Sequence, residues 1–272
     1  MSTFRFTRLI DNKKERFDDL KQLMNNPKGI ESETWLFVGA HDDDVCVGAG
    51  FWLQAAVQTG INVKVLIVTD GRMGYCAAEQ EADIVEIRHR ETLASFDILG
   101  ISPAHIIFLG YPDNDLYIRQ GRRKAMAGEP AIEGYTGLQN SFTYHLRKIR
   151  PQRVFVPADS DTHPDHKITY TELMISIWHA TGVIWPELGQ ALEQDPMIYA
   201  AAIYDDFYRL PNLELQADQA ALDKRMQSIV AYRSQAQIKG VTEEIQRLGP
   251  YEYLREVPFP RYSPSQYKSR FA

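Results

Sequence analysis

Two short clusters combine histidine with aspartate, side chains that proteins use together to bind zinc and related divalent cations. In His41–Asp44 one histidine precedes three consecutive carboxylates, and in His163–His166 two histidines flank a proline and an aspartate. Adjacent carboxylates repel one another, so at a concave sheet edge they favour a bound cation. Each cluster alone also fits a simpler interpretation. The first could be a solvated acidic turn in which Asp44 caps the next helix, and the second a surface loop with incidental histidines.

Both clusters follow short apolar runs that predict buried strands: the first comes directly after residues 35–40, and the second lies in the acidic loop 158–166 that follows residues 154–157. Further strands are expected at 63–69, 106–109 and 199–204, and helices at 46–59, 82–99, 142–149, 167–181 and 217–232. This alternation predicts an α/β, Rossmann-like fold, with a mostly parallel sheet and helices on both faces. Ligands of such sheets bind beyond the carboxyl ends of the strands. We therefore expect both clusters to meet at one rim.

The two ends of the chain have different patterns. Residues 12–26 predict a polar N-terminal helix, and the last twenty-five residues, rich in proline and tyrosine, predict an irregular C-terminal region. Because no repeat or flexible linker interrupts the sequence, we expect one domain over residues 1–272.

Composition narrows the classes of function. A net charge of −6 argues against general binding of nucleic acid or anionic membranes. The two cysteines, Cys46 and Cys76, are too few for a disulfide framework or a four-cysteine zinc site. The sequence has no run of eighteen apolar residues and no apolar N-terminal signal, so we expect no membrane span and a cytoplasmic location.

Taken together, the two clusters resemble the His-Pro-Asp-Asp and His-Pro-Asp-His signatures of the PIG-L/LmbE-like family of zinc-dependent N-deacetylases. The resemblance covers about residues 33–237, and weaker similarities lie at Thr69–Gly71, Arg88–Glu91, Leu109–Asp113 and Arg233–Gln235. Two positions depart from the family pattern: Asp42 stands where proline is usual, and Val45 where glutamate is usual. Neither position is a metal ligand in the family, but both departures affect the loop that carries the first cluster.

The resemblance implies a role for each polar residue of the clusters. It implies that zinc, or another divalent cation such as Fe²⁺, is held by His41, Asp44 and His166. It also implies that Asp43 is the general base, that His163 stabilises the oxyanion, that Asp165 orients an imidazole, and that Arg88 and Asp113 contact the substrate. For Arg88 a structural ion pair with Glu91 or Asp113 is an equally good interpretation.

The implied activity is hydrolysis of the acetamide of an N-acetylglucosamine-type sugar conjugate, a small-molecule substrate. Two alternatives stay open: a metallohydrolase that acts on another amide or an ester, and a family member that binds sugar or metal without catalysis. Nucleotide binding rests on analogy with Rossmann-like folds alone. The oligomeric state, including a homo-oligomer, is also left open by the sequence.

Overall fold

A mixed β-sheet organises the chain, of which the computed structural model describes residues 2–26, 28–259 and 261–271. One half of this sheet is parallel and contains every strand predicted from an apolar run. In spatial order its strands are β9 (Met197–Ala201), β8 (Arg153–Pro157), β3 (Thr34–Gly39), β4 (Asn62–Thr69) and β5 (Ile106–Tyr111).

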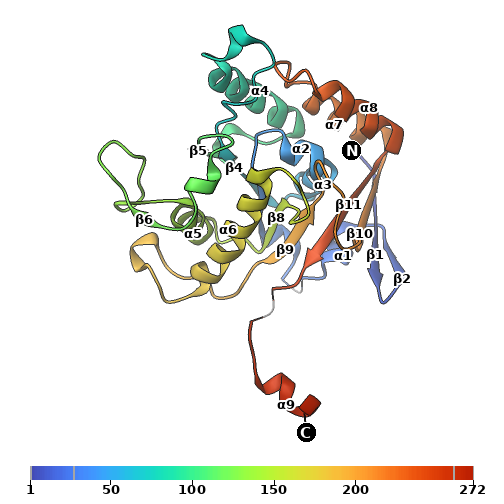
Figure 1. Cartoon of the computed structure of the whole chain (residues 1–272). Helices are drawn as coiled ribbons and strands as arrows, with labels where there is room; N and C mark the ends of the chain where they lie inside the picture. Colours follow the sequence, from blue (N-terminus) through green and yellow to red (C-terminus); the bar gives the residue numbers. More distant parts are fainter. Residues whose placement is uncertain (1, 27, 260, 272) are drawn as a thin grey trace.

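Helices cover both faces of the parallel half, because its central strands bury side chains on both sides (Figure 1). In β3, Trp35 and Phe37 pack into one core, whereas Leu36 and Val38 pack into the other. The first core is covered by α1 (Leu20–Met24), α2 (Asp44–Gly48), α3 (Gly50–Thr59), α4 (Ile84–Leu99), α7 (Gln219–Ile229) and α8 (Ile238–Leu248), and the second by α5 (Leu138–Ile149) and α6 (Pro164–Thr181). This arrangement confirms the predicted α/β class.

The other half of the sheet is antiparallel and adds β11 (Tyr251–Val257), β10 (Leu213–Ala217), β1 (Phe4–Ile10) and β2 (Lys13–Phe17) beyond β9, in that order. The prediction of an irregular C-terminal region is therefore wrong for β11. Its Glu252 and Leu254 are buried while Tyr251 and Tyr253 are exposed, the alternation of a strand that has one covered face.

The predicted N-terminal helix over residues 12–26 is also wrong. The first part of this region is β2, which forms a β-hairpin with β1, and of its described residues only Leu20–Met24 are helical. Asp11 and Asn12 join the two strands with positive φ angles of 49° and 62°, which suit a two-residue hairpin turn with a right-handed twist. The buried Phe4 and Phe6 alternate with polar residues, and this period of two was the sequence signal for a strand.

The remaining elements are small. β6 (Arg123–Lys124) and β7 (Tyr135–Thr136) form a separate two-stranded sheet, and α9 (Ser265–Phe271) extends away from the body (Figure 1). Within the part of the chain that the structure describes, no helix has the length and apolar character needed to cross a membrane. The single-domain assignment stays a prediction.

Candidate metal centre

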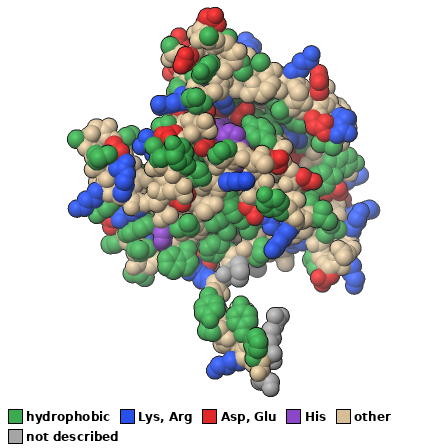
Figure 2. All heavy atoms as spheres, in the orientation of Figure 1, with side chains coloured by type: hydrophobic (Ala, Val, Ile, Leu, Met, Phe, Trp, Pro, Cys, Tyr) green, Lys and Arg blue, Asp and Glu red, His purple; other side chains and the backbone are tan. Residues whose placement is uncertain are grey.

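The two histidine–aspartate clusters meet beyond the carboxyl ends of the paired strands β3 and β8. His41 follows β3 and Asp44 begins α2, whereas His163 caps α6 and His166 lies in the first turn of that helix. Histidine side chains are visible among acidic and basic ones in the upper half of the face in Figure 2. The expectation that both clusters share one rim is therefore confirmed.

Three side-chain atoms converge closely enough to bind one cation. His41 Nδ1 lies 3.1 Å from His166 Nε2, and Asp44 Oδ1 lies 3.2 Å from His166 Nε2 and 3.7 Å from His41 Nδ1. A tetrahedral zinc ion with bonds of about 2.0–2.2 Å has ligand atoms about 3.3–3.6 Å apart. The two imidazole nitrogens and one carboxylate oxygen therefore fit such an ion in both chemistry and spacing.

The carboxylate of Asp44 supports this interpretation. One of its oxygens, Oδ2, accepts a hydrogen bond of 2.8 Å from the backbone N–H of His41. The other, Oδ1, is buried and has no hydrogen-bond partner, and it faces the two imidazoles. An unpartnered buried carboxylate oxygen is unfavourable, and a bound cation would satisfy it.

The electrostatics of the cluster are those of a site that favours positive charge. Burial opposes protonation of His41, but the carboxylates of Asp44, Asp113 and Asp165 outweigh it and raise the pKa of His41 well above its usual value. Burial likewise opposes protonation of His166, but Asp44 and Asp161 raise its pKa to about 9. The pKa of Asp44 is well below its ordinary value despite burial, because both imidazoles favour the carboxylate.

Each of the two imidazoles has a carboxylate close to its second ring nitrogen, the one that does not face Asp44. Asp113 Oδ1 lies 3.1 Å from His41 Nε2, and Asp165 Oδ2 lies 3.6 Å from the same nitrogen. Asp161 Oδ2 lies 2.9 Å from His166 Nδ1, close enough for an ion pair although off the line of an ideal hydrogen bond. Such partners fix the tautomer and the orientation of a metal-binding imidazole. Asp165 thus lies near His41, and its role in orienting an imidazole stays a prediction. Asp161 is a partner that the sequence analysis missed.

Other side-chain sets also lie close together. His41, His163 and His166 each offer a ring nitrogen within 4.8 Å of the others, as do His41, Asp113 and Asp165 with their nitrogen and oxygens. In the set that contains Asp44 all three separations are 3.7 Å or less, and the set includes the unpartnered oxygen, so we favour it as the cation site.

A cavity of about 260 Å³ opens beside the cluster, and His41, Asp43, Asp113 and His163 line it. Burial raises the pKa of Asp43 to about 6, with Arg88 opposing the shift. His163 Nδ1 accepts a hydrogen bond of 3.2 Å from the backbone N–H of Asp165, so in the neutral ring Nε2 carries the hydrogen. Burial, together with His41 and His166, lowers the pKa of His163, which favours this neutral form.

Arg88 reaches the same cavity from α4, but its charge partner was not foreseen. Arg88 Nε lies 3.0 Å from both carboxylate oxygens of Asp42, and Nη2 contacts Asp42 as well. Arg88 Nη1 donates to Gln235 Oε1 at 3.0 Å. Glu91 instead accepts hydrogen bonds from the backbone N–H and the hydroxyl of Ser234. The substrate contacts proposed for Arg88 and Asp113 stay predictions.

The two departures from the family pattern have different structural roles. Asp42 is buried, pairs with Arg88 and accepts a hydrogen bond of 3.0 Å from the Thr92 hydroxyl, and its backbone oxygen accepts one from Tyr232 at 2.6 Å. Val45 packs into the hydrophobic core. The position usually taken by glutamate is therefore part of the apolar core in this chain.

Two more residues of the cavity wall were not identified from the sequence as site residues. Tyr204 stacks on His166, with ring centroids 5.1 Å apart and an interplanar angle of 9°. No pattern in the sequence pointed to Tyr204. Gln235 lies in the segment Arg233–Gln235, which is similar to the family pattern, but the sequence analysis assigned no role to it.

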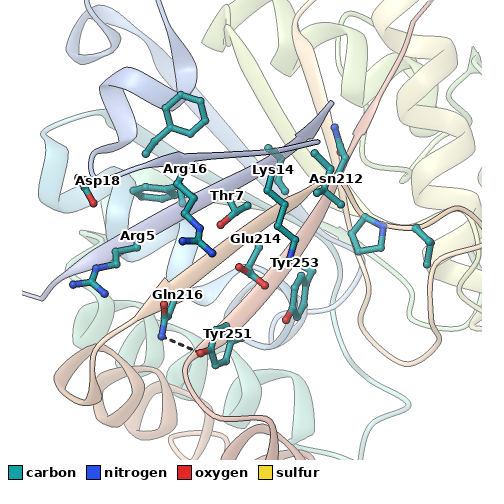
Figure 3. Close-up of a pocket in the computed structure, with 16 residues that line it drawn as sticks. Arg5, Thr7, Lys14, Arg16, Asp18, Asn212, Glu214, Gln216, Tyr251 and Tyr253 are labelled. Atoms are coloured by element: carbon teal, nitrogen blue, oxygen red, sulfur yellow. Dashed lines mark hydrogen bonds between the residues drawn. The ribbon is translucent and has the colours of Figure 1, made fainter. Parts of the chain in front are cut away.

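A larger cavity, about 780 Å³, lies elsewhere, on the outer face of the antiparallel strands. Figure 3 shows Arg5, Arg16, Tyr251 and Tyr253 on its wall. Of the described residues that line this cavity, none is a histidine or a cysteine. The smaller cavity is therefore the better candidate for metal-assisted chemistry, because it contains the clustered imidazoles and carboxylates.

The fold and the site together define an α/β protein with a buried histidine–aspartate cluster at the sheet rim, whose spacing fits a divalent cation. The chain belongs to the PIG-L family, described as GlcNAc-PI de-N-acetylase, whose model matches residues 36–177. This span is slightly more than half of the 272 residues. It contains both clusters.

Relatives of known name match parts of the chain. It is 27% identical over 158 residues to diacetylchitobiose deacetylase of Thermococcus kodakarensis, covering 56% of this chain and 48% of the relative. It is 28% identical over 149 residues to 1D-myo-inositol 2-acetamido-2-deoxy-alpha-D-glucopyranoside deacetylase of Kineococcus radiotolerans, covering 48% of this chain and 41% of the relative. The matches thus span about half or less of these relatives.

The fold is similar to a solved structure over most of both chains. The N,N'-diacetylchitobiose deacetylase of Pyrococcus horikoshii, in complex with an inhibitor, aligns with a TM-score of 0.65. The alignment covers 89% of this chain and 94% of that chain at 20% sequence identity. At 20% sequence identity, the similarity between the two structures shows a shared fold and no more.

We predict that Asp161→Asn weakens divalent metal binding by about 10–100-fold, because His166 loses the carboxylate that orients its ring. Competition with a fluorescent zinc chelator measures the affinity. The matched control is Asp159→Asn in the same loop, whose carboxylate pairs with Arg255 at 2.7 Å rather than with an imidazole of the cluster. Unchanged affinity in Asp161→Asn, or equal loss in the control, would contradict the orienting role.

We predict that Gly74→Ala destabilises the fold by about 1–3 kcal/mol, the usual effect of overpacking. A Cβ at Gly74 would overlap Arg88 Nη1, which Gln235 holds in place. Urea unfolding measures the change. Gly240→Ala is the control, because no atom lies within 4 Å of its added Cβ and the residue is inside α8. The control should be as stable as the parent or more so.

Proposed function

We propose that this chain is a zinc-dependent N-deacetylase that hydrolyses the acetamide of N-acetylglucosamine-type sugars. The observation that carries the proposal is the convergence of His41 Nδ1, Asp44 Oδ1 and His166 Nε2 beside a cavity that Asp43 and His163 line. Membership of the PIG-L family and the names of the relatives support the sugar substrate.

Three protein ligands suit a catalytic rather than a structural zinc site, because coordination positions stay open for water and substrate. His41, Asp44 and His166 would hold the ion. When bound there, zinc makes water more acidic and polarises a carbonyl oxygen. The carboxylates behind the imidazoles, Asp113 and Asp161, would keep the rings in the orientation that binding requires.

The residues on the cavity wall would move the protons. Asp43 would take a proton from the attacking water as its oxygen bonds to the acetamide carbon. His163 would donate a hydrogen bond from Nε2 to the oxygen that gains negative charge. As the carbon–nitrogen bond breaks, Asp43 would return the proton to the leaving nitrogen, which gives acetate and the free amine of the sugar.

Acetate release is the direct test of this function. The purified protein, loaded with zinc, is incubated with N-acetylglucosamine and N,N'-diacetylchitobiose, and both acetate and free amine are measured. Release of the two products in equal amounts supports the proposal. Activity on esters or other amides, with none on these sugars, would favour a different metallohydrolase.

We predict that removal of metal abolishes acetate release and lowers the melting temperature, because a ligand that binds the folded state stabilises it. Dialysis against a chelator gives the metal-free protein, and calorimetry measures its melting temperature. Addition of Zn²⁺ or Fe²⁺ should restore both properties, and their relative effect identifies the effective metal. Full activity at undetectable metal content would contradict metal dependence.

We predict that Asp43→Asn keeps its metal and loses about 10²–10⁴-fold in kcat, because an amide cannot accept the proton. Substrate affinity should change little. Asp44→Asn serves as the comparison and should lose metal affinity, with partial rescue by excess zinc. Metal analysis and kinetics of the two variants together separate the base from the ligand. Metal loss in Asp43→Asn alone would show that the two roles are exchanged.

A further inference from the structure

Arg88 is the one arginine or lysine among the described residues that line the catalytic cavity. It is also buried, with only 4% of its surface exposed. A lone cation in a substrate cavity ordinarily attracts an anionic group of the ligand. Whether Arg88 can do so depends on its remaining partners.

Every nitrogen of the Arg88 guanidinium already has a partner. Nε and Nη2 pair with the carboxylate of Asp42, and Nη1 donates to Gln235. Nη2 also lies 3.4 Å from Asp43 Oδ1. Two carboxylates thus face one guanidinium, so this wall of the cavity has no uncompensated positive charge.

The backbone around Arg88 keeps the guanidinium in that position. A Cβ at Gly71 would lie 2.7 Å from Arg88 Nε, and one at Gly74 would overlap Nη1. The loop therefore closes on the guanidinium at two glycines, and Gln235 Nε2 fixes the loop by donating to the backbone oxygen of Gly74 at 2.8 Å. Arg88 cannot swing toward a ligand without breaking these contacts.

From this arrangement we infer that Asp42 is a specificity-determining residue, which makes the cavity select substrates without an anionic group beside the reacting acetamide. A phosphate or carboxylate at this wall would meet Asp43, Asp113 and an arginine that is already paired. On this wall it would lose hydration without gaining a charge partner. An uncharged sugar avoids this penalty. The inference rests on the proposed function and narrows its substrate class to neutral N-acetylated sugars.

The test compares N-acetylglucosamine with N-acetylglucosamine 1-phosphate, whose phosphate is on the carbon next to the one that carries the acetamide, on the zinc-loaded protein. Calorimetric titration gives both dissociation constants, and acetate release gives kcat and KM. The parent protein should favour the uncharged sugar. Asp42→Asn, which removes the main charge partner of Arg88, should shift the affinity ratio toward the phosphate by about tenfold, as expected for one charge-assisted hydrogen bond. In the kinetic measurements, Asp42→Asn should change the ratio of the KM values of the two sugars and leave the ratio of their kcat values unchanged.

Two further variants identify the origin of the shift. The double variant Asp42→Asn with Arg88→Gln also removes the cation and should lose the gain. Glu252→Gln disrupts another buried pair, Arg225–Glu252 at 3.1 Å, and should leave the ratio unchanged. An unchanged ratio in Asp42→Asn at normal metal content, or a gain that persists in the double variant, would overturn the inference.

The parent protein tests the inference even if Asp42→Asn does not fold, because a preference for the phosphate would overturn it. The proposed function is tested separately. If neither sugar releases acetate, the deacetylase proposal fails, while the affinity ratios still decide whether Asp42 selects against anions.

Discussion

Three consecutive buried carboxylates, Asp42 to Asp44, impose the constraint on which the rest of the structure depends. Buried charges are stable only when they are paired or bind a cation. Each of the three carboxylates has different surroundings. Asp42 pairs with Arg88, Asp44 faces two imidazoles, and Asp43 borders the cavity. The positions of α4, α6 and the segment after α7 follow, because each supplies a partner for this short loop.

Much of the parallel half of the fold could be predicted from the sequence. Its strands are continuous apolar runs, such as residues 35–40, because helices cover both faces and leave no position for polar side chains. The clusters at His41 and His163 could be located for the same reason, since each follows such a run. Their place in the sequence, after predicted strands, was enough to locate them at the edge of the sheet.

The antiparallel half and the partners of the site could not be predicted in the same way. β11 alternates buried and exposed residues and contains tyrosines, so its weak pattern was taken for an irregular segment. The pair between Asp42 and Arg88 joins residues 46 positions apart, and the bond from Arg88 to Gln235 spans 147 positions. The sequence offered Glu91 and Asp113 as acidic partners of Arg88, and only the packing of α4 against the loop makes Asp42 the partner.

The hydrogen bond from Tyr232 to the backbone oxygen of Asp42 joins residues 190 positions apart and has a consequence for biosynthesis. A ribosome that adds about 5–20 residues per second needs about 10–40 s to make the intervening segment. During that interval the acidic loop exists without the tyrosine and glutamine that cover it. Completion of the centre therefore waits until residue 232 has been made, and a nascent chain that stalls before it presents an open, negatively charged loop to the cellular pool of cations.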